Sequence, residues 1–305
     1  MTATGSPPPQ PRLDPTDGLA AQLGYPPGAK LLIVTADDLG SSHSANVGVY
    51  DSLRQGLATS ASLMVPGPWA REAASRYRGE DVGVHLTLNA EHDLVRWGPI
   101  TQAPSLLDGD GGFPRTATDL GEHADVDEVR RECRAQIERA IYWGFDLSHV
   151  SSHLGAMERR PELFDVALEL CVEFALPLRL PDASLQPDMG YPFRELAAAE
   201  GVLSADYLIR VPAPPGPGRG RPSARRALER SLFDLRPGVT EVCIRPGADS
   251  AELRALAPDW SDRVDDHDLA VTDPSVPAMV ERAGATLIGY RVVRDLQRRR
   301  SGGDS

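Results

Sequence analysis

The segment 31–38, with the sequence LLIVTADD, constrains the fold more than any other part of the chain. It is a continuous apolar run that ends in two aspartates. A strand without polar alternation is buried on both faces, as the strands of parallel sheets are. A helix-like segment follows at 43–56 and ends at a glycine, which is a common helix terminator. The two segments together predict the first βα unit of an α/β protein.

Strand-like and helix-like segments alternate along the rest of the chain. Further strands are expected at 61–67, 82–88, 149–153, 177–181, 206–211, 239–247 and 285–293. Further helices are expected at 68–79, 125–143, 161–175, 193–200, 223–235, 250–257 and 275–284. This alternation implies a parallel sheet, and about seven such units favour closure into a barrel over an open sheet.

The 305-residue chain has the length of one α/β barrel domain. Residues 1–28 are rich in proline and polar side chains and are expected to form a flexible tail. Residues 29–297 are expected to form the single catalytic barrel, followed by a charged tail at 298–305. Proline, glycine and arginine dominate the segment 213–226, which is predicted to be a mobile surface loop.

Composition excludes several classes of partner. The net charge of −12 argues against nucleic acid and against an anionic membrane surface. The sequence has no apolar run of about 18 residues and no secretory signal at its start, so we expect a cytoplasmic protein. Its three cysteines are widely spaced among apolar residues, which is typical of small buried side chains and not of a cysteine zinc site.

Ionisable residues gather at the ends of the predicted strands. They are Asp37 and Asp38 after the first strand, His85 in the third, His149 and His153 around the strand at 149–153, Arg179 in the next, and Arg245 late in the strand at 239–247. In α/β barrels the functional face lies at the carboxyl ends of the strands. We therefore expect these side chains to converge on one site.

The residue types at these positions suit a divalent metal ion. Taken singly, Asp37 and Asp38 could be a helix cap and a turn acid, and His85 could be a hydrogen-bonded core histidine. Taken together, Asp38, His85 and His153 make a two-histidine, one-carboxylate set that can bind a metal and activate water. Two adjacent carboxylates push their pKa values apart, which suits one as ligand and the other as general base.

These residues lie in segments that resemble the YdjC/ChbG-type carbohydrate deacetylases. TADDLGSSHSANVGV resembles the NADDFG segment of that family, DVGVHLTLNAE its GxHLTLT block, and DLSHVSSHLGAM its T-H-x-D-S-H block. PLRLP and VTEVCIRPG occupy the places of two later blocks. The resemblance runs in order from about residue 30 to residue 295.

The resemblance implies a distorted (β/α) barrel related to polysaccharide deacetylases, and hydrolysis of the acetyl amide of an N-acetylated sugar. Position by position, it implies that Asp38, His85 and His153 hold one divalent ion, with zinc and magnesium the expected metals. It implies that Asp37 is the base that activates water and that Arg179 orients Asp37. The expected partner is a small-molecule sugar substrate, and a homodimer is also implied.

Two positions depart from the family pattern. Ser151 stands where the third block usually has Asp, and Arg245 stands where the last block usually has His. That histidine is the natural acid for the departing amine, and arginine does not release its proton at working pH. Arg245 could instead stabilise a developing negative charge or bind an acidic substrate, while His149 or His267 could take over as acid.

Two other functions stay open at this point. A family member that binds metal and ligand without turnover is favoured by Arg245. A metal-dependent isomerase or lyase on the same barrel would use Asp37 as its base without attack by water.

Overall fold

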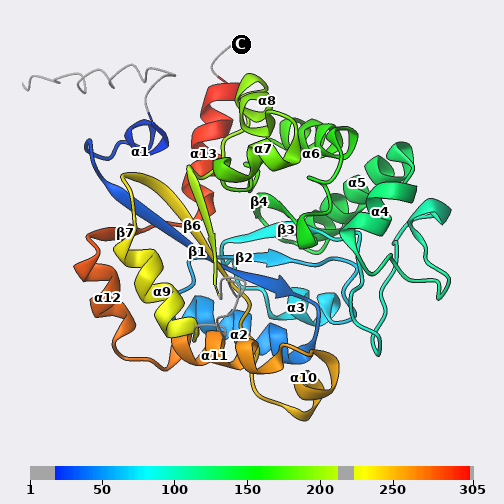
Figure 1. Ribbon diagram of the computed structural model, residues 1–305, viewed down its shortest axis with the longest axis horizontal. Helices are drawn as coiled ribbons and strands as arrows, with labels where there is room; N and C mark the ends of the chain where they lie inside the picture. The colour runs from blue at the N-terminus through cyan, green and yellow to red at the C-terminus, as the bar shows by residue number, and fades with distance from the viewer. Residues whose placement is uncertain (1–17, 212–222, 303–305) are drawn as a thin grey trace, which may run out of the picture.

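The centre of the computed structural model, which describes residues 18–211 and 223–302, is a parallel sheet (Figure 1). Its strands are β1 (Lys30–Leu39), β2 (Ser60–Leu63), β3 (Val82–Leu86), β4 (Leu147–Ser152), β5 (Tyr207–Arg210), β6 (Gly238–Ile244) and β7 (Ala285–Leu287). The strand order is β4-β3-β2-β1-β6-β5, and β7 pairs with the first residues of β1. The sheet is curled into a half-barrel, which confirms the predicted fold class.

Helices surround the sheet. They are α1 (Leu19–Gln22), α2 (His43–Arg54), α3 (Ala70–Arg76), α4 (Ala117–His123), α5 (Val126–Tyr142), α6 (Pro161–Glu173), α7 (Gln186–Met189), α8 (Phe193–Ala199), α9 (Ala224–Phe233), α10 (Ala251–Leu256), α11 (Trp260–Val271), α12 (Val276–Arg282) and α13 (Tyr290–Ser301). Short 3-10 turns occur at Pro104–Leu106, His153–Gly155 and Ala183–Leu185. Helix α2 packs against β1 and α11, α5 packs against β3 and α6, and α13 packs against β4. None of the described helices has the length and apolar character needed to cross a membrane.

Strand β1 is buried on both faces, as its apolar run predicts. Leu32 and Val34 belong to the large core beneath the outer helices. Leu31 and Ile33 point the other way and belong to a smaller core formed with α1 and α13. Burial of four large side chains in one strand contributes on the order of 8 kcal/mol, at about 2 kcal/mol each.

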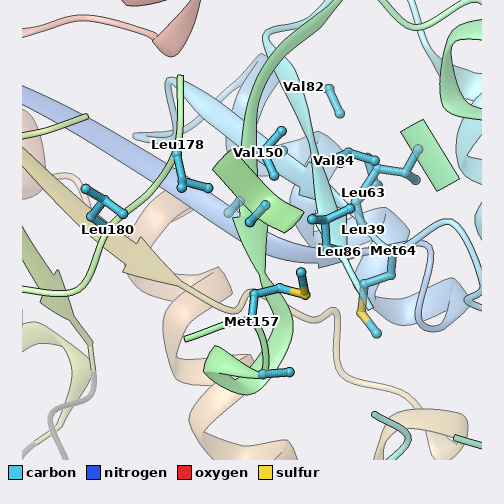
Figure 2. Packing of buried hydrophobic residues seen from close by; sticks show 14 of the residues in the cluster. Leu39, Leu63, Met64, Val82, Val84, Leu86, Val150, Met157, Leu178 and Leu180 are labelled. Atoms are coloured by element: carbon cyan, nitrogen blue, oxygen red, sulfur yellow. The ribbon is translucent and has the colours of Figure 1, made fainter. Parts of the chain in front are cut away.

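The inner face of the half-barrel becomes polar toward the carboxyl ends of the strands. In β2, Ala61 and Leu63 join the large core, whereas Ser62 turns inward and donates to Asp37. Val82, Val84 and Leu86 of β3 and Leu147 and Val150 of β4 also join this core, and Figure 2 shows several of them packed together, including Val84 and Val150. This period-of-two alternation places polar groups inside without disturbing the core.

The curl of the sheet is shown by one long-range contact. Leu178 forms a bridge with Val150 at the outer edge of β4. On a flat sheet this segment would lie about 19 Å from β1, because adjacent strands are about 4.8 Å apart. The guanidinium of the next residue, Arg179, nevertheless lies 2.8 Å from the carboxylate of Asp37 on β1.

Three secondary-structure predictions were wrong. The segment 285–293 was expected to be one strand, but β7 ends at Leu287 and α13 begins at Tyr290. The adjacent valines favoured a strand, while the buried positions Tyr290, Val293 and Leu296 follow helical spacing. The segment 177–181 makes a single bridge in place of a strand. Helix α11, rich in aspartate, was not predicted at all.

The folded part extends beyond the expected boundaries at several points. Leu19 and Ala20 of α1 are buried although they fall in the expected tail 1–28, of which residues 1–17 lie outside the described residues. Helix α13 likewise runs to Ser301, into the expected tail 298–305. In the expected loop 213–226, residues up to 222 lie outside the described residues, and α9 begins at Ala224.

We predict that Gly83→Ala destabilises the protein by about 3 kcal/mol, because an added Cβ would lie 2.5 Å from the carbonyl oxygen of His149. Gly109 has open space around it, so Gly109→Ala should change stability by less than about 1 kcal/mol. The measurement is the free energy of unfolding in urea for both variants. Equal values for the two would show that β3 and β4 are not packed as closely as described.

Candidate metal centre

A bulge in β1 turns two adjacent aspartates into the same space. Pairing between β1 and β2 shifts register between Ala36 and Leu39. Within that stretch Asp38 has φ 69°, in the left-handed region that aspartate tolerates better than most side chains do. Asp37 faces inward by the normal alternation of the strand, and the bulge redirects Asp38 inward as well.

Asp38 meets two histidines from different strands at the mouth of the half-barrel. Its Oδ1 lies 3.9 Å from His85 Nε2 and 3.7 Å from His153 Nδ1. One ligand atom from each of the three residues lies within 4.8 Å of the others, and all three side chains are buried. Atoms that share one divalent ion lie about 3 to 4 Å apart, so this donor set fits such an ion.

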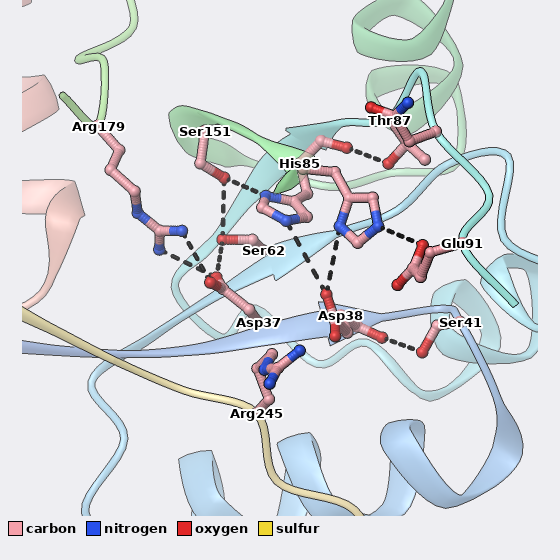
Figure 3. Close-up of polar contacts among 12 residues, drawn as sticks. Asp37, Asp38, Ser41, Ser62, His85, Thr87, Glu91, Ser151, Arg179 and Arg245 are labelled. Atoms are coloured by element: carbon pink, nitrogen blue, oxygen red, sulfur yellow. Dashed lines mark hydrogen bonds and ion pairs between the residues drawn. The ribbon is translucent and has the colours of Figure 1, made fainter. Parts of the chain in front are cut away.

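The outer nitrogen of each histidine ring has its own partner. His85 Nδ1 lies 2.7 Å from Ser151 Oγ, and His153 Nε2 lies 3.0 Å from Glu91 Oε2. The inner nitrogens, His85 Nε2 and His153 Nδ1, are thereby left facing Asp38. Figure 3 shows His85 directed toward Asp38. Outer partners of this kind fix ring orientation and tautomer in metal sites. Both rings are therefore held ready to bind an ion.

Opposing influences act on the histidine pKa values. Burial lowers the pKa of His85 to about 4, although the nearby Asp37 acts to raise it. The ring is therefore neutral at physiological pH, as a metal ligand must be. Burial also acts to lower the pKa of His153, but the carboxylates of Glu91 and Asp38 together act to raise it, and the net pKa is raised.

Asp37 is held by a two-pronged contact with Arg179. Arg179 Nη1 donates to Asp37 Oδ2 at 2.8 Å, and Nη2 donates to Oδ1 at 3.0 Å. Ser62 Oγ also donates to Oδ1 at 2.8 Å. Burial acts to raise the pKa of Asp37, but Arg179 and His85 together act to lower it, and the net pKa is lowered. Asp37 is therefore an ionised carboxylate whose Oδ2 accepts, among the described residues, from Arg179 alone.

Glu241 holds Arg179 from the opposite side. This buried residue of β6 accepts from Arg179 Nε at 2.8 Å and from Thr35 Oγ1 at 2.7 Å. Its other oxygen accepts from the hydroxyl of Tyr290, at the start of α13. The guanidinium thus lies between two carboxylates on neighbouring strands, which fixes its plane and its position.

These groups open into a cavity of about 210 Å³. Its lining comprises Asp37, Asp38, His85, Ser152, His153, Leu154, Arg179, Arg210, Val211, Cys243 and Arg245. A second hollow of about 370 Å³ shares Ser152, Leu154, Arg179 and Arg210 with the first. The combined space is lined by several arginines and can admit a ligand larger than one acetyl group.

Comparison with known proteins identifies the family. The YdjC-like protein family model matches residues 31–282. The chain belongs to the YdjC-like family. It is 37% identical to a carbohydrate deacetylase of Thermus thermophilus over 82% of this chain and 89% of that protein. It is 31% identical to a carbohydrate deacetylase of Geobacillus stearothermophilus over 85% of this chain and 96% of that protein.

A solved structure supports the fold. The crystal structure of a proposed cellobiose-phosphate cleavage protein from Enterococcus faecalis V583 superposes with a TM-score of 0.72. The superposition covers 87% of this chain and 99% of the Enterococcus faecalis chain, and the two sequences are 24% identical. This likeness shows that the half-barrel of this YdjC-like protein also occurs in a solved structure.

The residues expected to hold the metal or act in catalysis all reach the cavity of this YdjC-like protein, whereas His149, also expected to converge there, does not. Asp37, Asp38, His85, His153, Arg179 and Arg245 all line it. The two histidines considered as substitute acids do not line it. His149 is fully buried, with Ser62 Oγ 3.3 Å from its Nε2, and it stacks on the ring of Tyr290. His267 lies on α11 and faces Asp51 at 3.5 Å. Neither ring therefore faces the cavity, and the hypothesis that either protonates a leaving group stays a prediction.

Arg245 lies just beyond the carboxyl end of β6 and is held by α11. Its Nη2 lies 2.9 Å from Asp259 Oδ2, and its backbone N–H donates to Asp266 Oδ2 at 2.8 Å. The Arg245 side chain is 33% exposed, so it keeps access to the cavity while anchored. In Figure 3 the two aspartates lie between His85 on one side and Arg245 on the other.

Sequence reasoning missed four residues that support the site. They are Glu91 behind His153, Ser62 beside Asp37, Glu241 behind Arg179, and Arg263, which contacts Asp38. Glu241 could have been identified from the sequence, because a lone glutamate in the apolar strand VTEVCI requires a buried partner. Arg263 could not, since its helix was not predicted.

Asp266 gives the protein a pH-dependent stability. Burial raises its pKa to about 7, although the N–H of Arg245 acts to lower it. The folded state then holds a proton that the unfolded chain releases above its ordinary pKa of 3.8, so stability falls as pH rises from about 4 to 7. The difference in the free energy of unfolding between Asp266→Asn and the parent should therefore shift in favour of the variant by about 2 to 3 kcal/mol from pH 5 to pH 8.

Urea unfolding at the two pH values measures this shift. The control is Asp234→Asn, at an exposed position. If the variant and the parent differ in unfolding free energy by the same amount at pH 5 and at pH 8, Asp266 is ionised in the folded protein throughout this range.

Proposed function

We propose that this protein is a metal-dependent deacetylase that hydrolyses the acetyl amide of an N-acetylated sugar or sugar-containing metabolite. The observation that carries the proposal is the meeting of Asp38, His85 and His153 beside an ionised Asp37 in one cavity. The names of the carbohydrate deacetylase relatives give the substrate class. We further propose that the protein works in the cytoplasm on a small-molecule substrate.

Asp38 Oδ1, His85 Nε2 and His153 Nδ1 would hold the ion, with zinc or magnesium as the proposed metal. When bound, it supplies Lewis acidity toward the acetyl carbonyl and toward water. The three residues line the cavity, so a substrate or water molecule there could reach an ion that they held. The partners of the two histidines keep the ligand atoms in place during substrate exchange.

Asp37 acts as the general base. Its Oδ2 keeps an acceptor position free for a proton from the attacking water, while Arg179 and Ser62 occupy the other positions. The contact with Arg179 makes Asp37 a weak base but fixes its direction. Positional control of this kind contributes more than basicity when the water is already made acidic.

Arg245 stands where the family pattern usually has an acidic histidine, but it does not act as an acid. Its guanidinium stays protonated, so it can stabilise negative charge on the substrate but cannot supply a proton to the departing amine. Proton return then falls to Asp37 once it has accepted a proton, in the same cavity. Arg245 also supports the second candidate function, a family member that binds metal and ligand without turnover.

The first test measures metal content of the purified protein together with acetate release from a panel of N-acetylated sugars. The parent should contain metal and release acetate, and Asp38→Ala should lose both. Asp234→Ala, at an exposed position, is the matched control and should keep both. Metal without acetate would favour the non-catalytic alternative, and protein without metal would refute the proposal.

The second test separates metal binding from proton transfer. Asp37→Asn should retain metal, because Asp37 is not in the ligand set, yet lose about 100-fold or more in kcat. Acetate release under saturating substrate gives kcat, and elemental analysis gives the metal content. Unchanged kcat in this variant would remove Asp37 from the mechanism.

A further inference from the structure

We propose that Arg263 is a positioning residue that restricts Asp38 to one metal-binding oxygen and weakens the hold of the site on its ion. The inference rests on the proposed metal site. Arg263 lies on α11, distant in sequence from the three ligands, and it does not line the cavity. Its effect on an ion is therefore exerted through Asp38.

The contact between Arg263 and Asp38 is short and buried. Arg263 Nη1 donates to Asp38 Oδ2 at 2.8 Å, and the two side chains are only 6% and 4% exposed. The other oxygen, Oδ1, is the one that faces His85 and His153. Because Oδ2 already accepts a charge-assisted hydrogen bond, the carboxylate presents a single oxygen to the ion.

Helix α11 keeps the guanidinium from moving away. Asp259 at the N-cap position of the helix accepts from Arg263 Nε at 3.1 Å, one helical turn away. The second oxygen of Asp259 is held by Arg245 at 2.9 Å. The chain of contacts from Asp38 through Arg263 and Asp259 to Arg245 is therefore fixed at both ends.

The permanent charge of Arg263 opposes the charge of an ion. A guanidinium and a divalent cation then compete for the same carboxylate, in a region shielded from water where charges act strongly. Without an ion, the guanidinium also supplies the short charge-assisted contact that offsets the cost of burying the Asp38 carboxylate. Both effects favour the ion-free site, so removal of the charge should make the ion bind more tightly.

The experiment measures the dissociation constant for Co²⁺ and for Zn²⁺ by competition with a chromophoric chelator at constant pH. Arg263→Gln should bind each ion at least tenfold more tightly than the parent. Arg263→Lys, which keeps the charge but not the fork of donors, should lie close to the parent. The matched control is Arg254→Gln. Arg254 is an exposed residue of the neighbouring helix α10 and pairs with Asp249, so this variant should leave both constants unchanged.

Thermal unfolding gives a second readout that a purely structural role would not produce. Ion-free Arg263→Gln should melt below the parent, and the rise in melting temperature on adding metal should be larger than for the parent. A loss of packing alone would lower both melting temperatures equally. Arg263→Met provides the same comparisons should the glutamine variant not fold.

The outcomes separate this inference from the proposed function. Metal binding by the parent with equal or weaker binding by the Arg263 variants overturns the role of Arg263 and leaves the metal site intact. Absence of metal binding by the parent overturns both. Tighter binding by Arg263→Lys to the same degree as by Arg263→Gln would show that geometry, and not charge, is responsible, and would also overturn the inference.

Discussion

The rest of the site depends on the position of Arg179 between Asp37 and Glu241. A guanidinium shared by two buried carboxylates on adjacent strands joins β1 and β6 to the segment beside β4 across the mouth of the half-barrel. Removing one partner of such a buried pair typically costs about 3 to 5 kcal/mol, because the remaining charge stays buried away from water without a counter-charge. The same contact that orients the proposed base therefore also holds the curl of the sheet.

A polar interior of this kind is stable only when its groups are paired. The hydroxyls of Thr35 and Tyr290 complete the shell of Glu241, and Ser62 completes that of Asp37. Nearer the amino end of β1, Leu31 and Ile33 form an apolar core with α13. The half-barrel is thus layered, with hydrophobic packing at the amino ends of the strands and a hydrogen-bonded network at the carboxyl ends.

The fold and the candidate metal-binding residues could be predicted from the sequence because both follow short-range patterns. The apolar run before Asp37 predicts a buried strand, and the placement of His85 and His153 at strand ends predicts convergence. The supporting residues were not readable in the same way. Arg263 lies in a helix whose aspartates are poor helix formers, and only tertiary packing stabilises it there. The bulge that redirects Asp38 likewise depends on pairing with β2 and not on local sequence.

The stacking of Tyr290 on His149 and its contact with Glu241 join helix α13 to β4 and β6, and Tyr290 shares a core with Leu31 and Ile33 of β1. During synthesis, every strand of the half-barrel leaves the ribosome before Tyr290 does. Until α13 emerges, Glu241 lacks one of its donors and the inner side chains of β1 lack their cover. The nascent chain can therefore bury its outer core early, whereas the shell of Glu241 behind the candidate site is completed only after α13 has been made.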